Sequence, residues 1–140
     1  MVIDHIGIVV KSMDEGIAQW TNVFGYAQMT GKVVNTLQQV TVVFMKKEGS
    51  LPVKLLEPVS EKSPIYGFAA RGGGIHHICF KTDNLDKTID TFGQMKNEVR
   101  ILVKPQPGEA FENENIAFAL AKNNLNIELI DTDKRANIIA

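Results

Sequence analysis

Four residues with chemically active side chains occupy two pairs of equivalent positions in the sequence. His5 and His77 each lie near the start of an apolar run, in "DHIGIVV" and "HHICF". Lys54 and Glu128 each lie in a later apolar run, in "VKLLEP" and "IELIDT". Two imidazoles and a carboxylate are a ligand set for a divalent metal ion. A histidine near the start of a strand is more often a hydrogen-bonded structural residue, so both interpretations are open at this point.

The elements that must position these side chains occur twice. Residues 4–17 and 76–89 align at a constant offset, and each has an apolar run, a polar turn and a stretch of helical periodicity. Further β-like segments follow, at about residues 28–34 and "QQVTVVFM" in the first copy and at "VRILVKP" and "NIAFALA" in the second. We therefore predict an α+β fold of two tandem βαβββ modules that are related by a pseudo-twofold axis.

The repeat also predicts the domain boundaries. Residues 1–140 are expected to form a single domain, with module one at about 2–58 and a linker at about 59–73. Module two is expected at about 74–131, and a polar tail with an apolar end follows it. We expect this tail, residues 132–140, to dock on a partner subunit.

A pseudo-twofold axis brings equivalent positions together. If the first and last strands of each module are neighbours, the four chemically active side chains converge on one cavity. Because strand side chains alternate between the two faces of a sheet, His76 is expected to face away from His77. Gln39 and Thr41 are weaker candidates for contact with a ligand, since an ordinary strand role is favoured for both.

The bulk composition excludes several classes of function. A formal net charge of −1 gives no reason to expect binding to nucleic acid or to a membrane surface. Cys79 is the only cysteine, so an internal disulfide is impossible and a reducing compartment is favoured. The N-terminal stretch has no basic leader and no apolar run is long enough to span a bilayer. A cytoplasmic protein with a small-molecule substrate is the expectation.

Several segments resemble one known family. The chain resembles the vicinal oxygen chelate superfamily in six segments, which occur in the same order as in that superfamily. They are "IDHIGIVV", "VTVVFM", "LLEP", "SPIYGF", "GGIHHICFKTDNLD" and "IEL". That superfamily includes glyoxalase I, extradiol dioxygenases and bleomycin resistance proteins, and the likeness is greatest to its methylmalonyl-CoA epimerases. The resemblance implies that the two modules form a cupped mixed β-sheet with helices outside. It also implies a homodimer and a bound divalent metal ion, with Zn, Co, Ni, Mn and Fe all open.

The resemblance assigns the site residues by motif. His5, His77 and Glu128 match three of the family's metal ligands, and Lys54 stands where the fourth ligand is usually Glu or Gln. Lys54 could pair with Glu128 in place of the metal, lose its proton and ligate the metal, or swing out of the site. A fourth possibility is that Lys54 marks a site that no longer works. The metal is therefore either bound by the other three residues or absent because of Lys54.

The favoured function is that of a metal-dependent isomerase, epimerase or lyase. The metal would polarise a carbonyl on a small oxygenated or acyl-thioester substrate, so that the adjacent C–H becomes acidic. Lys54 and Glu128 are the expected catalytic residues. One alternative is an Fe(II) extradiol-type dioxygenase, because two histidines and one carboxylate form a facial triad. The other is a metal-free small-molecule binding or resistance protein, which a pair between Lys54 and Glu128 would suit.

Overall fold

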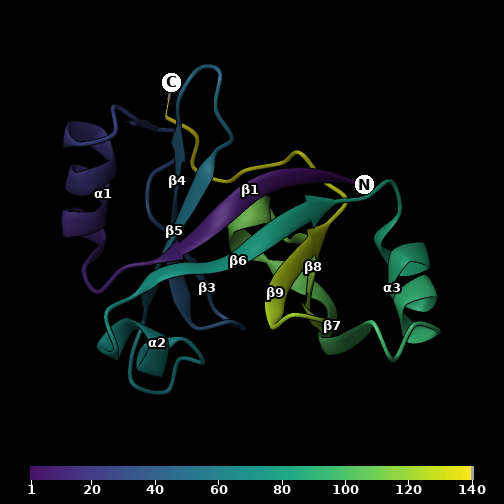
Figure 1. Cartoon of the computed structure of the whole chain (residues 1–140). Coiled ribbons are helices and arrows are strands. Elements are labelled where there is room, and N and C mark those ends of the chain that lie inside the picture. Colours follow the sequence, from purple (N-terminus) through teal and green to yellow (C-terminus); the bar gives the residue numbers. More distant parts are fainter. Residues whose placement is uncertain (140) are drawn as a thin grey trace.

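The two copies of the repeat form the two halves of one sheet. In the computed structural model, which describes residues 1–139, β1 (Val2–Val9) of the first half lies antiparallel beside β6 (Gly74–Lys81) of the second half (Figure 1). The register runs from Val2 opposite Lys81 to Val9 opposite Gly74. This central pair is where the two modules of the predicted repeat meet.

In each half the last strand lies parallel to the first. β5 (Val53–Pro58) pairs with β1, and β9 (Leu125–Ile130) pairs with β6. β4 (Val40–Lys46) extends the first half, whereas β8 (Glu114–Ala121) and β7 (Val99–Gly108) extend the second. The order is β2-β4-β5-β1-β6-β9-β8-β7, with β3 paired to β4 off this path. The predicted fold class, two βαβββ modules in one mixed sheet, is confirmed.

The first half departs from the prediction in one detail. The strand expected over about residues 28–34 is two short strands, β2 (Ala27–Gln28) and β3 (Val33–Asn35). Between them the N–H groups of Met29 and Thr30 both donate to the Phe44 carbonyl of β4, and the Gly31 N–H donates to the Asn137 carbonyl at 2.8 Å. The interruption therefore provides a place for the end of the chain to pair.

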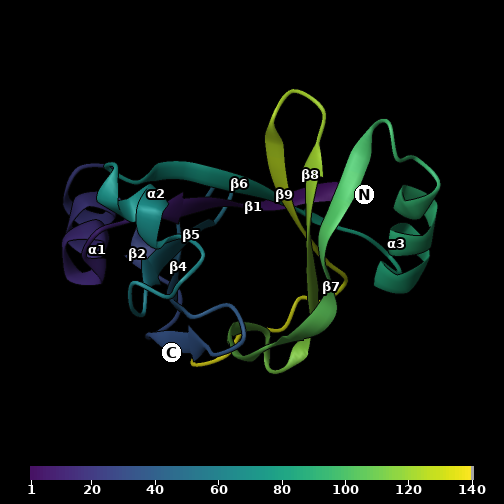
Figure 2. The same ribbon diagram turned by 90° about the horizontal axis from the view of Figure 1, so that it is seen from below.

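The two longer helices lie outside the sheet at opposite ends of the molecule. α1 (Met13–Asn22) lies beside the first half and α3 (Leu85–Gly93) beside the second (Figure 2). The side chains of Ser12 and Asn84 cap these helices, because each accepts the backbone N–H of the residue three positions later. Within residues 1–139, no helix has the length and apolar character needed to cross a membrane.

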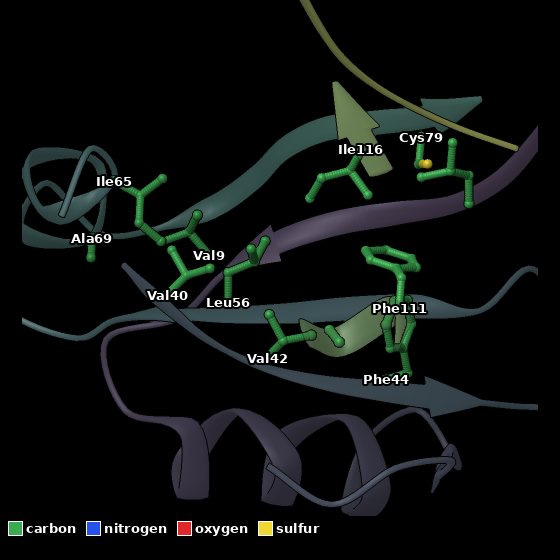
Figure 3. Packing of buried hydrophobic residues seen from close by; sticks show 12 residues of the cluster. Val9, Val40, Val42, Phe44, Leu56, Ile65, Ala69, Cys79, Phe111 and Ile116 are labelled. Atoms are coloured by element: carbon green, nitrogen blue, oxygen red, sulfur yellow. The ribbon is translucent and has the colours of Figure 1, made fainter. Parts of the chain in front are cut away.

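One buried cluster joins the two halves beside the central strands. Val9, Val42 and Leu56 pack with Phe44, and the short helix η1 (Glu109–Phe111) adds a second phenylalanine ring (Figure 3). The rings of Phe44 and Phe111 lie edge to face with 5.7 Å between their centroids. α2, residues 66–70 of the linker, lies over the end of this cluster, to which its buried alanine belongs.

The C-terminal tail lies on its own chain. The Arg135 guanidinium stacks over the rings of Phe44 and Phe111 at 4.7 and 4.8 Å from their centroids. The N–H of Ala136 donates to the Ala110 carbonyl at 2.9 Å. These contacts hold the described part of the tail across the two modules, and its docking on a partner subunit stays a prediction. The homodimer stays a prediction.

Candidate active site

The four side chains singled out in the sequence meet at the centre of the sheet. His5 on β1, Lys54 on β5, His77 on β6 and Glu128 on β9 each expose 3% of their surface or less. Glu128 Oε1 lies 3.0 Å from Nε2 of His5 and 3.1 Å from Nε2 of His77. Nζ of Lys54 donates to both Glu128 oxygens, at 3.2 and 3.0 Å. One carboxylate is thus the common partner of the other three groups.

A glycine on β1 makes room for this arrangement. Gly7 lies opposite Lys54 on one neighbouring strand and opposite His77 on the other. A Cβ at this position would overlap the imidazole ring of His77. Sequence reasoning did not single out Gly7, although a glycine inside an apolar strand is a recognised sign of a close approach.

The position of His76 corrects the expectation that it faces away from His77. Gly7 lies opposite His77 and Ile8 lies opposite Ile75, so His76 is the extra residue of a β-bulge. The bulge interrupts the alternation of side chains, and the Nδ1 atoms of the two imidazoles lie 2.8 Å apart. Burial, together with the neighbouring His77, lowers the pKa of His76 to about 4.

An equivalent irregularity places a carboxylate beside His5. The β1–β6 register also shifts between Ile3 and His5, at Asp4. Asp4 Oδ2 lies 2.7 Å from His5 Nδ1 and accepts from Arg135 at 2.5 Å. Burial opposes ionisation of Asp4, but the bond to His5 and the charge of Arg135 hold its pKa below the usual value. This contact orients the ring so that Nε2 faces Glu128. Sequence reasoning missed Asp4 and Arg135, and only the "DH" pair gave a signal.

The electrostatics of the cluster keep Glu128 ionised. Full burial opposes its ionisation, but the Lys54 ammonium and the bonds to His5 and His77 hold the pKa of Glu128 well below its usual range. Burial lowers the pKa of His77, and the carboxylate offsets this only in part. The buried negative charge of Glu128 is therefore paired with the ammonium ion of Lys54.

A cavity of about 270 Å³ opens beside Lys54. His76 and His77 line it together with mostly apolar side chains, whereas His5 and Glu128 do not. The other lining residues come from the end of β3, the β3–β4 connection, β4, β5, the linker, β7, β8 and β9. Lys54 and His77 both line the cavity and contact Glu128, so they are the residues through which the buried carboxylate can influence a ligand.

Two amide side chains in the cavity wall have unused hydrogen-bonding atoms. Asn35 Oδ1 accepts the Ala110 N–H at 2.7 Å, while its buried Nδ2 has no partner among the described residues. Both buried amide atoms of Gln38 are also unpartnered there. Since buried polar groups normally find a partner, these atoms are available to a ligand. Gln39 and Thr41, the residues proposed from sequence, do not line the cavity.

The cluster fits a divalent metal ion only in part. Ligand atoms of His5, His77 and Glu128 lie within 4.8 Å of one another, a group that could hold a metal ion. Lys54 is the misfit, because its ammonium donates to both oxygens of the only carboxylate in this group. A doubly charged ion about 4 Å from an ammonium would be repelled by roughly 8 kcal/mol at an effective dielectric of 20. The four side chains as they stand therefore do not fit a divalent ion.

Comparison with known proteins places the chain in a family. The model of the glyoxalase/bleomycin resistance protein/dioxygenase superfamily matches residues 4–118, most of the chain. The chain belongs to this superfamily. The resemblance stated from the sequence is thereby confirmed, and the segments that carried it include the strands of His5, Lys54 and His77.

Individual members of the superfamily include methylmalonyl-CoA epimerases. The mitochondrial methylmalonyl-CoA epimerase of Dictyostelium discoideum is 30% identical over 135 residues, which cover 95% of this chain and 78% of that protein. A variant of the Streptomyces coelicolor epimerase, in complex with 2-nitronate-propionyl-CoA, superimposes with a TM-score of 0.82 at 27% identity, over 95% of this chain and 98% of that chain. Another epimerase structure, with methylmalonyl-CoA and NH4+, gives 0.81 at 26% identity, over 99% and 98%.

Proposed function

We propose that this protein is an epimerase that acts on an acyl thioester, by removing and returning a proton at the carbon next to the carbonyl. Relatives that match over most of their length are named methylmalonyl-CoA epimerases. The nitronate in the Streptomyces complex is a planar anion, as is the enolate that loss of such a proton produces. The ammonium ion in the other complex indicates that a methylmalonyl-CoA epimerase can hold substrate and a nitrogen cation together.

The observation that carries the proposal is the buried ammonium of Lys54 in the wall of a mostly apolar cavity. When the C–H bond breaks, its electron pair moves toward the carbonyl and leaves a negative charge on oxygen. A fixed cation in a site with little water stabilises that developing charge. A base in the cavity wall must accept the proton, and His76, which lines the cavity and is neutral at pH 7 because its pKa is lowered to about 4, is placed to do so. Delivery of a proton to the opposite face of the enolate then gives the other epimer, so the reaction consumes no further reactant.

The residues behind Lys54 have a positioning role in this proposal. Glu128 was expected to be catalytic, but it does not line the cavity and bonds to Lys54, His5 and His77 instead. We propose that Glu128 acts through Lys54 by fixing the position of the ammonium. The two imidazoles in turn fix the carboxylate.

The cavity limits the part of the substrate that can enter. Ligand pockets usually measure about 300–1,000 Å³, so a cavity of about 270 Å³ suits a small acyl group. A larger thiol carrier would remain outside. Asn35 and Gln38 supply amide donors for a polar substituent on the acyl group, such as a carboxylate.

Exchange of the substrate proton with solvent tests the proposal. The protein is incubated with methylmalonyl-CoA in D2O, and loss of the α-proton signal is followed by NMR, with propionyl-CoA as the comparison that lacks the carboxylate. We expect catalysed exchange that falls by about 100-fold or more in Lys54→Met, because a fixed charge is removed. Lys87→Met, on the exposed face of α3, should retain the native rate. Saturable binding with no exchange would instead favour a binding protein.

A further inference from the structure

We propose that Lys54 is the resident cation of this site and that it excludes a divalent metal ion, so that the protein works without one. The inference about catalysis rests on the proposed function. The inference about metal binding does not, because it concerns the contacts of His5, Lys54, His77 and Glu128 in the absence of substrate.

The position of Lys54 leaves it little freedom to move aside. Only 1% of Lys54 is exposed. Its Nζ donates to both oxygens of Glu128 and lies 5.1 Å from the centre of the Phe111 ring. On the flanking strands it faces Gly7 and Phe44 in register. Bonds at one end and aromatic packing beside it hold the ammonium in the site.

The one carboxylate of the cluster already has a cation as its partner. Lys54 contributes one positive charge and Glu128 one negative charge, and the two imidazoles are the remaining members. A buried charge is tolerated only when it is paired and hydrogen-bonded. A divalent ion would add two positive charges to a neutral, buried pair, and the repulsion would act on the one carboxylate that could bind it.

The contacts of Glu128 lead to the same conclusion. Its Oε1 lies within 3.2 Å of His5 Nε2, His77 Nε2 and Lys54 Nζ. An oxygen in a carboxylate offers about two lone-pair positions, so three neighbours already exceed them. A metal ion at this oxygen would have to displace the ammonium. Nothing else in the cluster could then compensate the charge of Lys54.

Metal titration of the free protein tests this inference. Native protein is stripped with chelator, and Co2+ is added while its visible absorption and heat of binding are recorded. The same titration is run on Lys54→Glu, which adds a carboxylate, on Lys54→Gln, which removes only the charge, and on the exposed control Lys87→Gln. We expect one equivalent to bind to Lys54→Glu or Lys54→Gln at least about 1,000-fold more tightly than to the native protein or the control.

Each outcome of the titration has a meaning. Binding of one equivalent to native protein, with an affinity within tenfold of the folded Lys54 variants, would overturn the inference. Failure of native protein and of both folded variants to bind would show that Lys54 is not what excludes the metal, and would overturn it too. Circular dichroism identifies a variant that has not folded, and the charge-neutral Lys54→Gln then stands in for Lys54→Glu.

The catalytic part is tested on native protein by chelation. Exchange of the substrate proton should continue at an unchanged rate after chelator treatment, and added Co2+ should not raise it. Loss of exchange with chelator and its recovery with metal would contradict a metal-free mechanism. If no exchange occurs under any condition, the proposed function fails, whereas the metal titration still decides whether Lys54 excludes the ion.

Discussion

Breaking the buried pair between Lys54 and Glu128 should destabilise the fold strongly. In Lys54→Met the carboxylate of Glu128, with no exposed surface, loses the ammonium that compensates its charge. Removal of one partner of a buried ion pair costs about 3–5 kcal/mol. For a chain of this length such a loss lowers the melting temperature by roughly 10–15 °C. Unfolding in urea, followed by circular dichroism, measures the free energy directly.

The partner substitution separates pairing from packing. Glu128→Gln retains a carbonyl oxygen near His5 and His77 but removes the negative charge, so that Lys54 is then the unpaired group. The double variant Lys54→Met, Glu128→Gln contains neither charge. We expect each single variant to lose about 3–5 kcal/mol and the double variant to lose at least about 2 kcal/mol less than the sum of the two.

The control lies on the surface of the second module. Lys122 and Glu98 form an ion pair at 3.0 Å, but both side chains are more than half exposed. The equivalent cycle there should give a coupling energy of about 1 kcal/mol or less. If the effects at Lys54 and Glu128 add to within about 0.5 kcal/mol, the two groups are not a coupled buried pair and the charge argument is refuted.

Three further predictions concern the surroundings of this pair. Gly7→Ala should displace the His77 ring and cost about 1–3 kcal/mol in urea unfolding, while Gly93→Ala, whose Cβ meets no neighbour, should cost little. Because the pKa of Glu128 is lowered in the fold, the ionised carboxylate stabilises the protein at neutral pH. This stabilisation is lost as the pH falls below about 4.5 toward the lowered pKa. As the pH falls through this range, the free energy of unfolding should therefore decrease more steeply for native protein than for Glu128→Gln. Asn35→Asp keeps the acceptor for Ala110 but removes the amide donor, so KM for an anionic acyl group should rise about tenfold or more in initial-rate assays; an unchanged KM would remove Asn35 from the substrate site.

The fold could be predicted because the same signals occur in both halves. His5 and His77 begin matching apolar runs, and the capping residues Ser12 and Asn84 begin the helices that follow. Repetition makes each weak local signal stronger, since an accidental pattern rarely occurs twice at the same spacing. The parallel pairing of first and last strands, which was only a condition of the expected convergence, occurs in both halves of the structure.

The details of the site depended on irregular backbone that the sequence pattern does not show. Alternation of side chains predicts that His76 and His77 face opposite ways, and it fails because one extra residue is inserted into the ladder. Asp4 lies at the matching register shift beside His5. Both irregularities occur in the central pair of strands, and both bring a second polar side chain next to an imidazole. Asn35 and Gln38 were missed for a similar reason, since the turn after β3 decides which amides reach the cavity.

The cost of changing Lys54 also bears on which substitution could let this site bind a metal ion. A buried lysine needs a charged partner, and for Lys54 this partner is Glu128, which also contacts the imidazoles of His5 and His77. Lys54 and Glu128 therefore compensate each other's charge, and neither charge is tolerated in the core without the other. Metal binding at this site requires a change at Lys54, because any change at Glu128 removes the sole carboxylate of the ligand group. The same reasoning makes Lys54→Glu informative: a single substitution should destabilise the metal-free protein by placing two carboxylates together and should be rescued by Co2+, whereas the native protein should gain no stability from the ion.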